Sequence, residues 1–282
     1  MMIRNKKIFI VCITFVVMIS FCFSISMMNA TNSIENIEKK LNDQLLEKSN
    51  EYYTVASTLE SSENLINEFL GSCEITYPLY SSEKAAFKKY EFKRSNGFIV
   101  YDYKDHDNSF GKLIDNGYSW VISMFDDQGQ INKVCCIMRK GKNINDFLNL
   151  PNIKDRHVGK DEIDHIKKFE DKWKLSSIGH KLPIDCIKFM SDTHTAAEFL
   201  NNNNIKNPSE IKLVDGSFDG VANILYIREG NIEYGIPFKW ENDGPEWLDS
   251  GAVYEMSRLM ELFEQHRNEL QMFNNIGDGT LD

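Results

Sequence analysis

The chain has 282 residues, 42 % of them apolar, and its 42 Asp and Glu residues outnumber its 32 Lys and Arg residues, which gives a net charge of −10. This length suffices for one large or two small domains, and the apolar fraction can supply a core. The negative charge repels phosphate backbones and anionic headgroups, so composition disfavours nucleic acid as a partner and gives no support to a peripheral membrane-binding surface.

An apolar run over residues 8–28, from Ile8 to Met28, follows the cations Arg4, Lys6 and Lys7. About twenty helical residues span the hydrocarbon core of a bilayer, and cations on one side hold that side in the cytoplasm. Residues 1–30 are therefore predicted to be a signal peptide or a membrane anchor, and the rest of the chain is predicted to be extracytoplasmic. The small residues Ser24 and Ser26 fit a cleavage site, so a cleaved signal peptide and an uncleaved anchor both remain open.

Residues 31–72 are predicted to be a helical juxtamembrane region. Apolar residues recur there at spacings of three and four, which indicates one apolar stripe that Lys48 interrupts. The stripe, from Ile34 to Leu59, could pack on the chain's own domain or pair with another subunit in an assembly.

Residues 73–140 are predicted to be an antiparallel β region. Aromatic and β-branched residues with local alternation predict strands over 75–80, 87–94 and 97–103, and residues 118–125 and 131–139 read as a hairpin around Gly129.

Residues 141–274 are predicted to be an α+β region that ends in a long helix, followed by a tail over 275–282. Helices are expected over 161–173, from 192 to about 200 with Asp192 as the N-cap, and from about 251 to 273. Strands are expected over 210–214, 221–228 and 232–240.

The fold class that follows is α+β, with antiparallel strands and hairpins flanked by helices. A helix followed by a hairpin occurs in both halves, which leaves open two similar subdomains, although no residue-level repeat supports a duplication.

Four cysteines lie beyond the apolar run: Cys73, Cys135, Cys136 and Cys186. An extracytoplasmic location permits a disulfide, and four thiols allow three pairings. Cys135 and Cys136 are neighbours on a predicted strand, so their side chains should point to opposite faces and a bond between them is disfavoured. Cys73 or Cys186 is the better mate for one of them, and buried free thiols are an equal alternative.

Two groups of residues have the composition of a catalytic site. Cys186 and His194, with Asp185 or Asp192, supply a thiolate, an imidazole base and a carboxylate. Asp161 and His165 stand four residues apart on one helix face and could act as a carboxylate and imidazole pair. Zinc signatures and glycine-rich phosphate loops are absent from the sequence, so neither a metal nor a cofactor is predicted.

An aromatic cluster offers a binding surface. Tyr234, Trp240 and Trp247 stand near acidic residues at a strand end and turn, as in surfaces that contact peptides or glycans. The alternative is that these rings form a small core between the last hairpin and the final helix.

The sequence therefore predicts an exported or membrane-anchored protein of bacterial type, whose composition, rich in Asn, Ile and Lys, is typical of an AT-rich genome. Its predicted role is a non-catalytic binding or scaffolding module for a protein, peptide or glycan, attached to the membrane through residues 8–28 if these are uncleaved. A secreted hydrolase that uses the Cys/His or the His/Asp site is the alternative.

Overall fold

The computed structural model describes most of the chain beyond the apolar run. The described residues are 31–42, 49–62, 64–66, 97–103, 114–125, 131–149, 153, 156–180, 182–216, 221–240 and 246–277. The predicted anchor or signal peptide lies outside them. Within these ranges, no helix is both long enough and apolar enough to cross a membrane.

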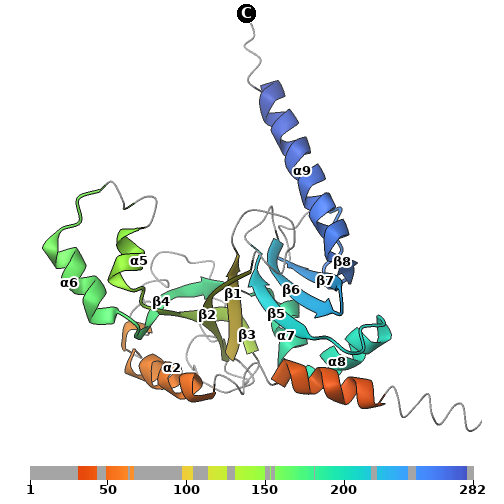
Figure 1. Cartoon of the computed structure of the whole chain (residues 1–282), viewed down its shortest axis with the longest axis horizontal. Helices are drawn as coiled ribbons and strands as arrows, with labels where there is room; N and C mark the ends of the chain where they lie inside the picture. The colour runs from red at the N-terminus through yellow and green to blue at the C-terminus, as the bar shows by residue number, and fades with distance from the viewer. Residues whose placement is uncertain are drawn as a thin grey trace, which may run out of the picture.

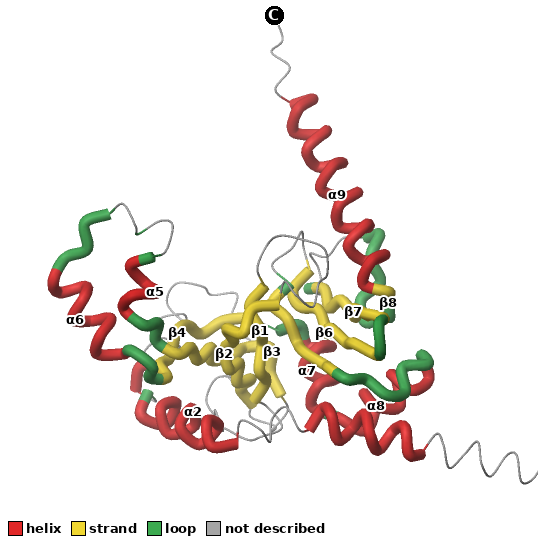
Figure 2. The backbone as a smooth tube through the Cα atoms, viewed as in Figure 1, coloured by secondary structure: helices red, strands yellow, loops and turns green. Residues whose placement is uncertain are grey.

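One sheet of eight strands runs through the molecule (Figures 1 and 2), in the order β4-β3-β2-β1-β5-β6-β7-β8. Every pair of neighbours is antiparallel except β1 and β5, which are parallel and join the two halves of the chain. The strands are β1 (Gly97–Tyr103), β2 (Ile114–Phe125), β3 (Ile131–Lys140), β4 (Trp173–His180), β5 (Glu210–Asp215), β6 (Val221–Glu229), β7 (Ile232–Lys239) and β8 (Tyr254–Glu255).

Alternation of side chains along the strands gives the sheet two apolar faces. On β1, Phe98 and Val100 belong to one buried cluster, whereas Ile99 belongs to another on the opposite face. A sheet that buries both faces needs helices on both sides, and the chain supplies them.

Helices cover both faces. They are the helix over residues 31–42, α2 (Ser49–Ser61), α7 (Ile184–Ser191), α8 (Thr193–Asn202) and α9 (Met256–Gly277). Two further helices, α5 (Ile144–Leu148) and α6 (Lys160–Phe169), contact each other, and α6 has no buried residue.

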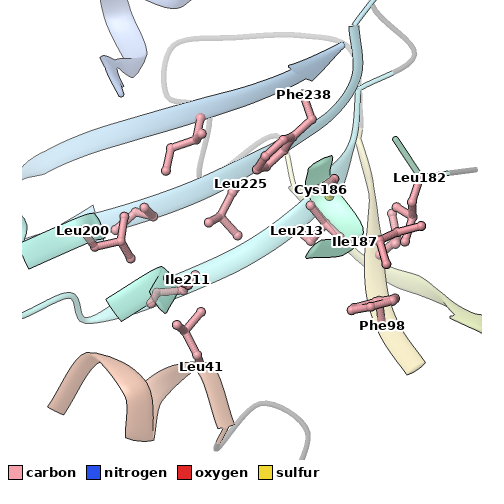
Figure 3. Packing of buried hydrophobic residues seen from close by; sticks show 14 of the residues in the cluster. Leu41, Phe98, Leu182, Cys186, Ile187, Leu200, Ile211, Leu213, Leu225 and Phe238 are labelled. Carbon is pink, nitrogen blue, oxygen red and sulfur yellow. The ribbon is translucent and has the colours of Figure 1, made fainter. Parts of the chain in front are cut away.

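The largest buried cluster, shown in Figure 3, lies between one face of the sheet and the helices 31–42, α7 and α8. It draws on both halves, with Val121 from β2 and Leu225 from β6. On the other face, α2 covers the half built from β1 to β4 through Val55 and Leu59, and α9 covers the half built from β5 to β8 through Leu259. Each fully buried aliphatic side chain contributes about 1.5 to 3 kcal/mol to folding.

The predicted strands over 97–103, 131–139, 210–214, 221–228 and 232–240 are confirmed within one residue at each end. The strand predicted over 118–125 is also found, but it begins four residues earlier, at Ile114. The cap of α8 is confirmed, because the Asp192 carboxylate accepts a bond from the Thr195 amide. The predicted strands over 75–80 and 87–94 lie outside the described residues, as does Cys73.

Two predictions need correction. The helix expected over 161–173 ends at Phe169, because the chain turns at Asp171, which has a φ of 55°, and Trp173 begins β4. The amide of Gly141 donates to the Lys172 carbonyl and so fixes this turn. The strands were also expected to be antiparallel throughout, whereas β1 and β5 are parallel.

Candidate functional site

The structure does not bring Cys186 and His194 into contact. Cys186 lies on α7 and is completely buried in the large cluster, and burial raises the pKa of its thiol, so the thiol is protonated at neutral pH. His194 lies on the surface of α8, with Nδ1 at 3.2 Å from Oε2 of Glu38 and Nε2 at 3.5 Å from Oε1 of Glu198. Both ring nitrogens therefore face carboxylates, as in an ion pair.

Asp161 and His165 are exposed on α6, a helix with no buried residue. The His165 ring packs against the Phe169 ring, at 5.0 Å between ring centres. In the part of the chain that the structure describes, no group of three His, Cys, Asp or Glu residues is arranged to hold a metal ion.

The structure places the aromatic candidates Tyr234, Trp240 and Trp247 apart. Tyr234 packs against the large cluster on one face of the sheet, whereas Trp247 packs on the opposite face against the Phe263 and His266 rings of α9. Trp240 follows β7 and is half-buried. Trp247 therefore belongs to a small core beneath the final helix, which is the alternative that the sequence left open.

A different aromatic surface is assembled from α2, β1 and β2. We call it the tyrosine patch and define it by Tyr52, Tyr53, Tyr101 and Tyr118. Tyr53 is 70 % exposed, and the other three rings are half-buried.

The rings of the patch form a connected set. Tyr52 contacts Tyr53 edge-on, at 5.5 Å between ring centres, and lies 6.0 Å from the buried Trp120. Tyr101 and Tyr118 are partners across β1 and β2, with ring centres 5.7 Å apart. Aromatic pairs at such separations add about 0.5 to 1.5 kcal/mol beyond the area that they bury, so the rings hold one another in place.

The carboxylate of Glu51 links the two parts of the patch. The Tyr118 hydroxyl donates to Glu51, at 2.7 Å and 2.8 Å from its two oxygens, and the Trp120 indole donates to Oε1 at 2.9 Å. Hydrogen bonds to a charged acceptor contribute about 1.5 to 3 kcal/mol each. Burial raises the pKa of Tyr118 above its usual value and the bond to Glu51 raises it further, so the phenol remains a donor.

A row of charges on β5, β6 and β7 continues from the patch. The Lys212 ammonium lies 5.0 Å from the centre of the Tyr101 ring, a favourable cation–π distance. Glu210 pairs with Lys212 and with Arg228, and Arg228 also pairs with Glu233. The patch is therefore aromatic with a charged border on the side of the parallel strand pair.

The sequence shows the two aromatic pairs of this patch separately, but not that they come together. Tyr118 and Trp120 stand two residues apart on a predicted strand, so they share one face, and Tyr52 and Tyr53 are adjacent on a predicted helix. Nothing in those local patterns shows that α2 lies over β2, and sequence reasoning therefore selected the aromatic residues near the last hairpin instead.

No protein family matches this sequence, and no curated protein and no solved structure is similar to the chain.

Half-exposed aromatic rings held by a half-buried carboxylate suit recognition. Rings in fixed positions lose little conformational entropy on binding and present a large contact area. The phenol hydroxyls at the rim can donate and accept hydrogen bonds.

Proposed function

We propose that this protein is an extracytoplasmic binding module that contacts a protein partner through the tyrosine patch. The observation that carries the proposal is the patch itself, in which two tyrosine pairs from three elements are linked through the bond between Tyr118 and Glu51, and Tyr53 is 70 % exposed. Aromatic residues of this kind supply most of the binding energy in protein interfaces.

The charge of the chain indicates what kind of partner surface fits. The net charge is −10, and complementary potentials accelerate association and exclude partners of like charge. The proposed partner therefore carries basic side chains around an apolar centre that receives the rings.

Export rests on the apolar run and the three cations before it. The helix over 31–42, which begins shortly after the run, is part of the folded body. Ile37 is completely buried in the large cluster, and the Ser33 hydroxyl donates to the Lys206 carbonyl at 2.9 Å.

The helix over 31–42 stays with the folded body whether or not the apolar run is cleaved. If the run is an uncleaved anchor, only Asn29 and Ala30 separate it from the docked helix, so the body is held close to the bilayer surface. If the run is removed after Ser26, the released body keeps the helix and its buried residues. Binding through the patch is compatible with either fate.

Site-specific photo-crosslinking tests this proposal. A benzophenone amino acid replaces Tyr53 in the full chain, produced in a bacterial host. In a matched chain it replaces Ile232, which is 47 % exposed at the start of β7 and is outside the patch. We expect a discrete adduct of one protein from position 53 and none from position 232.

Competition separates specific binding from random capture. Added wild-type protein should abolish the adduct from position 53, whereas added Tyr53→Ser protein should compete at least about tenfold less well, because one central aromatic residue contributes more than about 1.4 kcal/mol to an interface. Equal adducts at both positions, or equal competition by the two proteins, would contradict the proposal.

A further inference from the structure

The structure sorts the three described cysteines onto the two faces of the sheet. Cys135 and Cys136 are neighbours on β3, but Cys135 belongs to the large cluster and Cys136 belongs to the cluster beneath α2. Cys186 of α7 lies in the large cluster with Cys135 and with Leu213 (Figure 3). Among the described cysteines, Cys135 and Cys186 are thus the pair that shares one side of the sheet.

These two residues also lie on elements that contact each other. Helix α7 packs directly on β3, and both thiols are completely buried between them. Each is a thiol in this structure. After burial, the next largest influence on the pKa of Cys186 is the charge of Cys135, which raises it further.

The surroundings of the pair are compatible with a bond between them. The Sγ atom of Cys135 also contacts the Ser123 hydroxyl at 3.4 Å, and the other neighbours of the two sulfurs in the cluster are apolar. A disulfide is neutral, so it can replace the two thiols in this apolar cluster without burying a charge.

We propose that Cys135 and Cys186 are joined by a disulfide bond in the mature protein. The proposal rests on the proposed function in one respect, since only an extracytoplasmic compartment supplies the oxidant. The oxidant is a disulfide donor, such as an oxidised thiol–disulfide oxidoreductase.

The reaction is a pair of thiol–disulfide exchanges. One cysteine thiolate attacks the donor disulfide to give a mixed disulfide, and the second cysteine then displaces the donor. The two cysteines together lose two protons and two electrons, and the donor becomes a dithiol. Because both thiols are buried in the folded protein, the exchange takes place before α7 docks on β3.

The bond would tie α7 to β3 across the segment that contains α5, α6 and β4. A disulfide stabilises a protein mainly by restricting its unfolded chain, and the effect grows with the length of the closed loop. Reduction should therefore lower the melting temperature by about 5 to 15 °C.

The test has one arm in solution and one in cells. The purified full chain, in detergent, is reduced, unfolded and refolded in oxidised glutathione, and its cysteines are mapped by alkylation and mass spectrometry. We expect a peptide linked through Cys135 and Cys186. The Cys136→Ala variant should keep this linkage, and the Cys135→Ala variant should leave Cys186 free for alkylation. Free Cys135 and Cys186 after oxidative refolding, or a bond from either one to any other cysteine, would overturn the inference.

The second arm distinguishes failure of this inference from failure of the proposed location. Cells that produce the full chain are treated with an alkylating agent before lysis, so that the redox state in the cell is trapped. A pair that is linked after refolding but reduced in the cell shows that the pairing is right and the proposed export is wrong. A pair that is linked in both arms supports both proposals.

Discussion

At the scale of single residues, Asn223 is a buried polar residue whose side chain lacks hydrogen-bond partners. It lies on β6 opposite Phe238 of β7 and is completely buried, and neither its side-chain oxygen nor its nitrogen has a hydrogen-bond partner in this structure. A buried polar group without a partner costs about 1 to 3 kcal/mol.

We therefore expect Asn223→Leu to stabilise the protein. Leucine has a similar branched shape but no polar atoms, so the unfolding free energy should rise by about 1 kcal/mol or more. Urea denaturation measures the change. Ser123→Ala is the control, because that buried hydroxyl has a contact with Cys135 and its removal should bring no gain. A loss of stability in Asn223→Leu would show that the amide has a partner after all.

At the scale of secondary-structure elements, the attachment of the helix over 31–42 depends on pH. His194 lies between Glu38 of that helix and Glu198 of α8, and Asp192 stands two residues away. The hydrogen bond to Glu38 is the largest influence, and it raises the pKa of His194 above 6.5. The charged imidazolium is therefore the form that holds the helix.

The sign of the pH effect follows from this shift. Because the folded pKa is raised, the contribution of His194 is fully present below about pH 6.5, the unfolded value, and is lost as the pH rises through the folded pKa. Hydrogen exchange of amides 31–42, corrected for intrinsic rates, should show more protection in the wild type than in His194→Gln at about pH 5.5, and equal protection at about pH 8.5. A difference in protection between the two proteins that stays constant from about pH 5.5 to about pH 8.5 would contradict a role of charged His194 in holding the helix.

Most strands could be predicted from the sequence, but β4 could not. Strands β6 and β7 carry long aromatic and β-branched runs, and their boundaries were predicted within one residue. Strand β2 was predicted from the run that begins at Tyr118, and its first four residues were missed. Strand β4 was missed because Ser176, Ser177 and Gly179 are weak strand formers and because its register shifts opposite Ile137 and Met138 of β3. The shift leaves Ser176 without a partner in the pairing and breaks the alternation along β4.

Contacts between distant elements were beyond local patterns. The parallel pairing of β1 with β5 joins Val100 to Leu213 across more than a hundred residues, and no short-range signal encodes it. The tyrosine patch was missed for the same reason, since α2 meets β2 only in the folded chain. The burial of Cys135 and Cys186 in one cluster likewise became visible only when α7 was placed on β3.

At the scale of the whole molecule, the two halves share one sheet and one large buried cluster. The sequence left open two similar subdomains. The parallel pairing of β1 with β5 joins the two halves at the centre of the sheet, so the halves are not separate in structure. A shared core couples the stabilities of the parts that build it.

We therefore expect the halves to unfold together. In hydrogen exchange measured at increasing urea, amides of β3 and of β6 should lose protection at the same concentration. Leu213→Ala, in the shared cluster, should lower the opening free energies of the β3 amides and of the β6 amides by about 2 to 5 kcal/mol, because it leaves a cavity between the halves. The control variant Ile232→Ala, at an exposed position, should leave both opening free energies unchanged. Loss of protection in β6 while β3 stays protected would establish two independent units.

We propose that the folded acidic body lies outside the cytoplasm, where its tyrosine patch can meet a partner. The decisive measurement adds protease to intact spheroplasts that produce the full chain with an epitope fused after Asp282. We expect the epitope to be lost while a cytosolic marker survives, or to be found already in the medium if the apolar run is cleaved. An epitope that stays intact in the spheroplasts until they are lysed would show that the body is cytoplasmic.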